Sequence, residues 1–279
     1  MADLYTTTTL ECSKLITEYY STSFTLGIKT LDKKLHAPIY AIYGFVRYAD
    51  EIVDTFHDYD KEKLLSKFSE DTYDAIDQGI SLNPVLHSFQ LVVNQYGIER
   101  ELIDAFLYSM EMDLTHETYS NEKYQEYIYG SAEVVGLMCL HVFCNGDKDQ
   151  YDQLKYPARN LGAAFQKVNF LRDIKSDYKS RGRVYFPEVD FKSFSDHDKE
   201  QIELDIEKDF SAALDGIKAL PKGARAGVYL AYTYYYQLFK KIKRTSPKTI
   251  LNGRVRIPDG IKFILLTKTL ILNKLNAIG

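Results

Sequence analysis

The chain has 279 residues, of which 45% are hydrophobic and 27% are charged, a composition typical of globular proteins. A formal charge of −4 argues against nucleic-acid binding, which requires a basic surface. Three cysteines at unrelated spacings (Cys12, Cys139 and Cys144) indicate neither a disulfide framework nor a zinc site. There is no signal-peptide pattern at the N-terminus and no apolar run of the ~18 residues that span a bilayer, so we expect a cytoplasmic protein.

Nearly every segment of the chain predicts helix, and strand-like alternation is scarce. The clearest start is Asn83, a capping residue before Pro84 at the first helical position, and Gly97 ends that helix. Four other prolines are predicted helix starts: Pro38, Pro157, Pro221 and Pro258. The predicted helices cover residues 10–20, 38–56, 61–79, 84–96, 99–115, 121–144, 148–176, 198–219, 222–244 and 258–277. No repeat and no Pro/Gly-rich linker divides the chain, so we predict a single all-α domain over residues 1–279.

The first acidic cluster lies in the predicted helix 38–56. Asp50 and Asp54 are four residues apart, so they share one helix face, and Arg47 precedes them by one turn. The preceding residues, 41–46, are mostly apolar, which predicts that these carboxylates belong to a largely buried helix.

The second acidic cluster begins in the predicted helix 148–176. Asn169, Asp173 and Asp177 repeat at four-residue spacing, and Arg172 adjoins the middle one. Residues 161–171 are largely apolar or small, as in the first cluster. A pair of aspartates on a helix is most often a solvated face, and this reading stays open for each pair taken alone.

Together, the two clusters predict a metal and phosphate site. Clustered carboxylates repel one another unless a cation lies between them, and Mg²⁺ (or Mn²⁺) prefers such oxygen ligands. The guanidinium groups beside them are suited to phosphate oxygens. The two clusters are similar but far apart in the chain, as two walls of one cleft would be.

The least helical stretch, residues 178–196, follows the second cluster and contains R-G-R-V-Y-F-P. A basic loop with a glycine could close over a phosphate-bearing substrate. The alternative is an ordinary surface connection.

These motifs, in this order, resemble the squalene/phytoene synthase family, the head-to-head (1′-1) prenyl synthases. The resemblance runs from about Tyr20 to Pro187. It is carried by Y-Y-S-T-S-F, by P-I-Y-A-I-Y-G-F-V-R-Y-A-D-E-I-V-D, by M-E-M-D-L with Y-Q-E-Y-I-Y-G-S-A-E-V-V-G-L-M, by L-G-A-A-F-Q-K-V-N-F-L-R-D-I-K-S-D, and by G-R-V-Y-F-P. It implies the isoprenoid synthase fold, a helical bundle around a deep apolar cavity.

The resemblance also implies roles for particular residues. The implied Mg²⁺ ligands are Asp50, Asp54, Asn169, Asp173 and Asp177. The first aspartate of each cluster, Asp50 in the first and Asp173 in the second, is also implied to take part in catalysis. The implied substrate contacts are Ser21, Ser23, Phe24, Arg47, Gln166, Arg172 and Arg256. Tyr43 and Tyr127 are expected near the reacting carbons.

Several positions differ from the family pattern or are less clearly assigned. Glu51 follows the first aspartate where Asp is common, and Glu133 replaces a small residue in a central helix; Glu133 faces either outward or the cavity. The arginine near the C-terminus that would grip phosphate is Arg254 or Arg256. Phe24 and Ile28, one turn apart, are candidates for the cavity wall or for ordinary packing.

The activity implied by the resemblance is the condensation of two geranylgeranyl diphosphates to phytoene, with Mg²⁺ and without NADPH. Alternatives are a thirty-carbon dehydrosqualene or squalene synthase using farnesyl diphosphate, another ionisation-type enzyme of this fold, and a non-catalytic scaffold relative. We expect a monomer or weak homodimer. The basic segments K-K-I-K-R and I-K-F-I-L-L-T-K-T-L-I-L-N-K-L suggest peripheral contact with an anionic membrane, or a core-packed terminal helix with solvated lysines.

Overall fold

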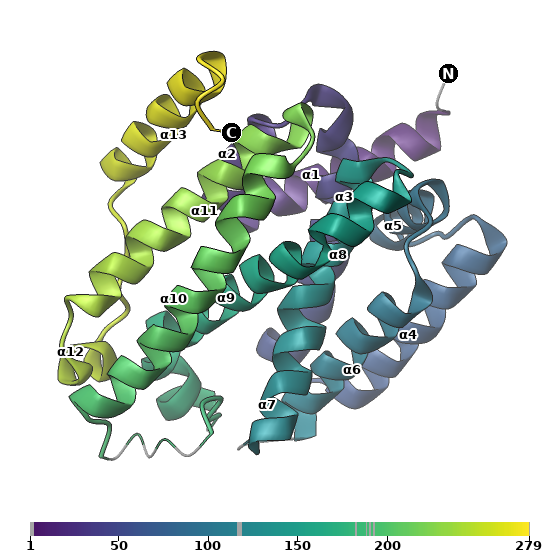
Figure 1. Cartoon of the computed structure of the whole chain (residues 1–279). Coiled ribbons are helices and arrows are strands. Elements are labelled where there is room, and N and C mark those ends of the chain that lie inside the picture. The colour runs from purple at the N-terminus through teal and green to yellow at the C-terminus, as the bar shows by residue number, and fades with distance from the viewer. Residues whose placement is uncertain are drawn as a thin grey trace.

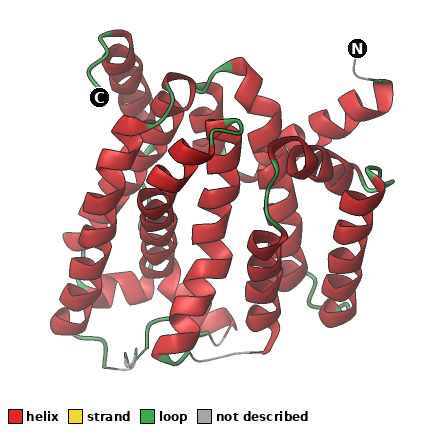
Figure 2. Cartoon of the chain, turned by 45° about the vertical axis from the view of Figure 1, so that its right-hand side comes forward, coloured by secondary structure: helices red, strands yellow, loops and turns green. Residues whose placement is uncertain are grey.

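The computed structural model describes residues 3–115, 119–181, 183–187, 189, 191 and 193–278. Helices make up nearly all the regular structure of these residues, which confirms the predicted all-α class (Figure 2). The helices are α1 (Leu4–Tyr20), α2 (Thr22–Lys29), α3 (Lys33–Thr55), α4 (Lys61–Gln78), α5 (Pro84–Tyr96), α6 (Arg100–Thr115), α7 (Asn121–Ile128), the π-helical turn η1 (Tyr129–Glu133), α8 (Val134–Cys144), α9 (Lys148–Arg181), α10 (Asp196–Ala219), α11 (Lys222–Lys243), α12 (Pro247–Asn252) and α13 (Asp259–Lys274).

Two apolar clusters form the core. The first joins α3, α4, α5, α6 and α8, and the second joins α7, α9, α10 and α11. In Figure 1 the helices α10 and α11 lie on one side of the molecule and α4, α5 and α6 on the other. Helices α3 and α9 carry the two acidic clusters of the sequence, one within each half.

Helix α5 begins and ends where the sequence predicts. The Asn83 Oδ1 atom accepts hydrogen bonds from the backbone N–H of Val85 (3.0 Å) and Leu86 (3.4 Å), which satisfies donors of the first turn. Gly97 adopts φ of 64°, the left-handed conformation that ends a helix at little cost for glycine.

Two of the four proline predictions are wrong. Pro221 and Pro258 directly precede α11 and α13, as predicted, but Pro38 and Pro157 lie inside α3 and α9. A proline inside a helix costs about 3 kcal/mol. Pro157 is accommodated by its neighbour in α10, since a Cβ atom added to Gly216 would lie 2.3 Å from the Pro157 Cβ. The close packing of α9 on α10 therefore offsets the local cost.

The predicted helix 121–144 contains a π-helical turn, and two short helices, α2 and α12, are absent from the prediction. The π-turn lies at a close contact with α6: a Cβ on Gly130 would lie 2.3 Å from the Ala105 carbonyl oxygen. A close contact between two helices can favour a π-turn, and such a contact cannot be predicted from the hydrophobic periodicity of one segment.

Among the described helices, the continuous run Asn121–Cys144 is long and apolar enough to cross a membrane by composition alone, with mean hydropathy 1.4. More than half (56%) of its most apolar window is buried inside the protein. Core helices commonly pass this test, so the run is weak grounds for a membrane span.

Candidate active site

A cavity of about 690 Å³ lies between the two core clusters. Its walls come mainly from α2, α3, α8, α9 and α11, with contributions from α6, α7, η1, α10 and the segment after α9. Its position between the clusters explains why side chains distant in sequence reach one space.

The cavity has an apolar end and a polar end. Along α3 its lining changes from Ile39 and Ile42 to Asp50 and Asp54. Along α9 it changes in the same sense, from Leu154 and Leu161 to the residues of the second acidic cluster. At ~1.5 Å per helical residue, the stretch from Ile39 to Asp54 is roughly 22 Å long. The cavity is thus an elongated apolar space with charged groups at one end.

Most of the predicted site residues line this single cavity, as two walls of one cleft should. Those that do are Ser21, Phe24, Ile28, Tyr43, Arg47, Asp50, Asp54, Tyr127, Gln166, Asn169, Arg172, Asp173 and Asp177.

Two predicted substrate contacts do not line it. Ser23 faces a small neighbouring pocket instead. Arg256 is exposed, and its backbone carbonyl accepts a hydrogen bond from Lys241 (2.7 Å). Arg254 lines the cavity in its place, with its Nε atom 2.7 Å from Asp173 Oδ1, because it directly follows α12, which packs against α9. Of the two arginines left open by the sequence, the geometry thus favours Arg254.

The structure also shows that Glu133 does not face the cavity. Its Oε2 atom accepts a hydrogen bond from Arg159 Nε (2.6 Å), and its side chain is not part of the cavity lining. The acidic residue in the central helix therefore stabilises packing between η1 and α9 and does not add charge to the cavity.

The carboxylates at the polar end contact guanidinium groups. Asp54 Oδ1 lies 3.1 Å from Arg183 Nη1, and Asp173 Oδ2 lies 2.5 Å from Arg172 Nη2. Arg47 pairs with Glu51 and lies 4.0 Å from Asp50. The excess negative charge expected from sequence is thus partly neutralised by arginines of the same site.

Asp50 has an unusual titration. Enclosure by the protein raises the pKa of its carboxyl to about 7, which the nearby Arg47 opposes and Asp54 reinforces. About a third of the side chain (36%) is exposed, and it faces the cavity. Because the raised pKa means that the ionised carboxylate is destabilised in the folded protein, a cation entering the cavity would stabilise it.

Three functional candidates were missed by the sequence reasoning: Asp113, Arg183 and Tyr185. Asp113 is buried (9% exposed) and accepts hydrogen bonds from the hydroxyls of Tyr127 (2.7 Å) and Tyr185 (3.1 Å). Arg183 donates to the Asp113 carbonyl (3.0 Å) and contacts Asp54. All three lie in M-E-M-D-L and G-R-V-Y-F-P, so the motifs indicated the segments but not the contacts between them. Gly182, in the second motif, lies outside the described residues.

Aromatic rings line the cavity near its polar end. Phe165 stacks on Tyr235 with centroids 4.0 Å apart, and the Phe24 and Tyr43 centroids are 5.7 Å apart. Burial raises the pKa of Tyr43 to about 12, and burial together with Asp113 raises that of Tyr127 well above its usual value. Both phenols stay protonated near neutral pH and present ring faces that can stabilise a cation.

The residues at the polar end fit a hard divalent cation that shares a bound anion. Among the described residues, no three acidic, histidine or cysteine side chains converge closely enough to hold a metal ion alone. However, the Asn169 Oδ1 atom is buried without a hydrogen-bond partner. The side chains near it that could coordinate a metal ion would do so through oxygen atoms. Mg²⁺ commonly takes one or two carboxylates and completes its coordination with water and phosphate oxygens.

Similarity to known proteins identifies the family of the chain. Residues 17–260 match the squalene/phytoene synthase family. The chain is 29% identical to phytoene synthase of Arthrospira platensis, over 92% of this chain and 90% of that protein. It is 32% identical to presqualene diphosphate synthase of Sinorhizobium fredii, over 59% of this chain and 58% of that protein.

A solved structure supports the fold. A dehydrosqualene synthase in complex with a ligand superposes with a TM-score of 0.80 at 20% identity, covering 96% of this chain and 98% of that one. The isoprenoid synthase fold and the resemblance inferred from the sequence are therefore confirmed, and the chain belongs to the squalene/phytoene synthase family.

Proposed function

We propose that this protein is a phytoene synthase, which joins two geranylgeranyl diphosphates head to head through prephytoene diphosphate and releases two diphosphates. The observation that carries the proposal is the elongated apolar cavity with two acidic clusters and several arginines at one end. Such a cavity suits substrates with a long apolar tail and an anionic head. The likeness to phytoene synthases supports the forty-carbon product.

Asp50, Asp54, Asn169, Asp173 and Asp177 would hold Mg²⁺, or Mn²⁺ in its place. The bound metal would neutralise the charge that develops on a departing diphosphate, which favours ionisation of the allylic substrate.

The arginines have two sets of partners in this proposal. Without substrate, Arg172 and Arg254 pair with Asp173, and Arg183 pairs with Asp54. A diphosphate entering the polar end offers these guanidinium groups fork-shaped acceptors and leaves the carboxylates available to a cation. Substrate and cation would therefore bind together more tightly than either binds alone.

The remainder of the cavity protects reactive cations. Its apolar wall houses the two tails and excludes water, which would quench a carbocation. Tyr43 and Tyr127 face the region beside the carboxylates, where the reacting carbons would lie. Asp113 fixes the orientation of the Tyr127 hydroxyl, which donates a 2.7 Å hydrogen bond to its carboxylate.

A thirty-carbon product is the second candidate. The likeness to a presqualene diphosphate synthase and to a 4,4'-diapophytoene synthase favours it, since neither name indicates a forty-carbon product. A scaffold role is disfavoured because the acidic clusters and their arginines are all present in the cavity.

The test is analysis of the hydrocarbon formed from purified protein, Mg²⁺ and either geranylgeranyl or farnesyl diphosphate, with and without NADPH. We expect phytoene from geranylgeranyl diphosphate, with no NADPH requirement. A thirty-carbon product alone would replace this proposal with the second candidate, and the NADPH requirement would separate squalene from dehydrosqualene. Absence of any condensation product would contradict both.

A further inference from the structure

Helix α13 exposes an unusually apolar surface. It packs on α11 through one side, where Leu265 and Thr269 are buried, and lies at the edge of the molecule (Figure 1). Its outer side exposes large apolar residues, with Phe263 and Leu275 each 69% exposed. The full set, which we call the α13 face, is Ile261, Phe263, Ile264, Leu270, Ile271 and Leu275.

The α13 face is periodic and contains lysine. Ile264, Lys268, Ile271 and Leu275 follow one another at spacings of four, three and four residues, which places them in one stripe along the helix. Lys274 lies beside this stripe. Neither Lys268 nor Lys274 has an acidic partner in the part of the chain that the structure describes.

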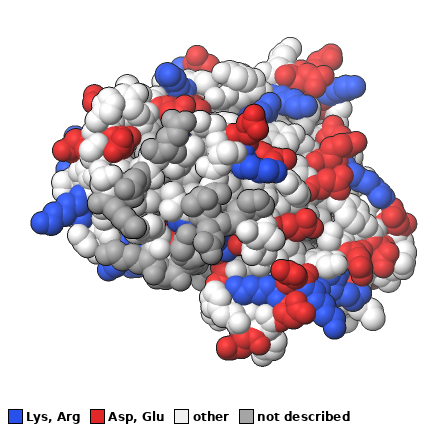
Figure 3. Space-filling model, turned by 90° about the horizontal axis from the view of Figure 1, so that it is seen from below, with Lys and Arg blue, Asp and Glu red and all other residues white. Residues whose placement is uncertain are grey.

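Charge is strongly segregated toward this end of the chain. Residues 240–279 contain ten lysines or arginines and one aspartate, a formal charge of +9, so the rest of the chain carries −13. Figure 3 shows many aspartates and glutamates along the right side of the face seen from below, with lysines and arginines among them. Three of these basic residues, Lys262, Lys268 and Lys274, lie on α13, whose only acidic residue is Asp259, so the helix itself has a net positive charge. The end of α11 and α12, which carry most of the others, lie away from α13 (Figure 1).

We propose that the α13 face docks on an anionic lipid surface. A helix with a broad apolar face and lysines beside it lies in the headgroup region of a membrane, where lysines near the surface each contribute about 1 kcal/mol. A second copy of this chain is a poorer occupant, since pairing two α13 faces would bring the lysines Lys268 and Lys274 of both copies together, with no acidic residue on the face to neutralise them. The positive charge thus selects an anionic lipid surface.

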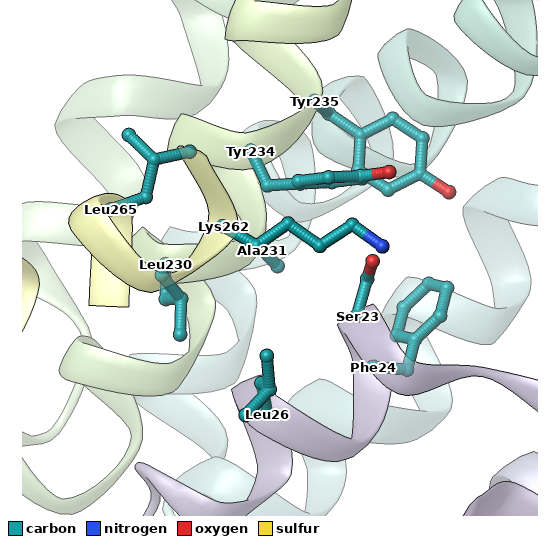
Figure 4. Close-up of a pocket in the computed structure, with 9 residues that line it drawn as sticks. All are labelled: Ser23, Phe24, Leu26, Leu230, Ala231, Tyr234, Tyr235, Lys262 and Leu265. Carbon is teal, nitrogen blue, oxygen red and sulfur yellow. The ribbon is translucent and has the colours of Figure 1, made fainter. Parts of the chain in front are cut away.

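Docking would place one side of the cavity against the lipid. A small pocket of about 20 Å³ lies between α2, α11 and α13 and shares Phe24, Ala231 and Tyr235 with the main cavity (Figure 4). Lys262 of α13 reaches across it, with its ammonium 5.8 Å from the Tyr234 ring centroid. If the proposed function holds, the shared residues make α13 a close neighbour of the cavity wall that would contact the substrate.

The experiment is flotation of the purified full-length protein with phosphatidylcholine vesicles, with and without phosphatidylglycerol. We expect binding only when phosphatidylglycerol is present, and weaker binding at high salt. The double variant Lys268→Gln/Lys274→Gln should bind about 30-fold more weakly. The variant Ile264→Asn/Ile271→Asn should lose binding, because its α13 face no longer has the apolar side chains that would insert into the headgroup region.

Matched controls carry equivalent changes elsewhere. Leu82→Asn replaces a residue that is 92% exposed between α4 and α5, and Lys63→Gln/Lys67→Gln removes two charges from α4. Both should bind as the unchanged protein does. Circular dichroism and condensation activity on detergent-solubilised substrate show that each variant is folded, and they separate failure of docking from failure of the proposed function.

Two results would overturn the proposal. One is equal vesicle binding by the α13 variants and the controls, or no binding to anionic vesicles at all. The other is a dimer in gel filtration that becomes a monomer in Ile264→Asn/Ile271→Asn, which would make the α13 face a self-association surface.

Discussion

Asp113 holds two tyrosine hydroxyls at the polar end of the cavity. Replacement by asparagine preserves its shape but substitutes an N–H donor for one of the accepting oxygens. The Tyr127 hydroxyl then loses its fixed orientation. We expect Asp113→Asn to lower kcat by about 100-fold with a smaller change in KM, as for a misplaced group near the reacting atoms.

The control is Asp209→Asn, which removes another buried carboxylate, paired with Lys167 outside the cavity. It should lower thermal stability and leave kcat nearly unchanged. Equal effects of the two variants on kcat would show that Asp113 acts only through stability.

Asp50 predicts a pH dependence of stability in the metal-free protein. Its pKa of about 7 in the folded state lies above the ordinary 3.8, so ionisation costs the folded state free energy. This free-energy cost is absent below pH 3.8, grows as the pH rises, and reaches its full value above pH 7. Since the group is partly exposed, we expect Asp50→Asn to raise Tm above pH 7 by only about 2–4 °C.

The gain should disappear as the pH falls toward 3.8, which thermal unfolding of both proteins across this range would measure. The exposed Asp215→Asn on α10 serves as the control, with no such pH-dependent gain. A constant difference between Asp50→Asn and the unchanged protein at all pH values would contradict the prediction.

At the residue scale, the sequence predicted the charged groups that repeat along one helix and missed those joined by folding. Asp50 with Asp54, and Asn169 with Asp173, were recognisable because helix geometry alone puts them on one face. Asp113 and Arg183 are 70 residues apart, and their contact depends on how the segment after α9 returns to α6. Local spacing contains no information about such a contact.

At the element scale, α8 forms part of the apolar end of the cavity through Cys139, Leu140 and Phe143. Cys139→Phe would fill this end with a ring. We expect kcat/KM for geranylgeranyl diphosphate to fall about tenfold relative to that for farnesyl diphosphate, which competition assays would measure.

Cys12→Phe makes the same substitution on α1, at a partly buried position that does not line the cavity. The ratio of the two kcat/KM values should stay unchanged in this control. An unchanged ratio in Cys139→Phe as well would show that the apolar end does not limit substrate length.

The elements themselves were predictable where the chain supplies its own ends. Asn83 and Gly97 define α5 through hydrogen bonds and backbone conformation that any helix needs. Pro157 misled the prediction because the glycine that accommodates it, Gly216, lies in another helix. Helix α12 has six residues, too few for a periodic pattern.

At the scale of the whole molecule, the proposed ligands belong to both halves of the core. Asp50 lies on α3 in one half and Asp173 on α9 in the other, so a bound metal–diphosphate unit would join them. We expect Mg²⁺ with inorganic diphosphate to raise the free energy of unfolding by about 2.7 kcal/mol at a hundredfold excess over Kd.

Thermal unfolding with Mg²⁺ alone and with diphosphate alone provides the controls, and each should give a smaller rise than the two together. Asp50→Asn and Asp173→Asn should each abolish the combined effect. Stabilisation that survives in both variants would contradict the ligand assignment.

The helical run α7–η1–α8 spans the cavity from Tyr127 at the polar end to Phe143 at the apolar end. In an uninterrupted α-helix, residues four apart drift by about 40° per step, so positions 127 and 143 would diverge by about 160°. The wider η1 turn cancels much of this drift. Deleting one residue from η1 would therefore rotate one end of the run by about 100° relative to the other. The length of this five-residue turn thus determines the direction in which the residues at the apolar end point, relative to those beside the reacting carbons.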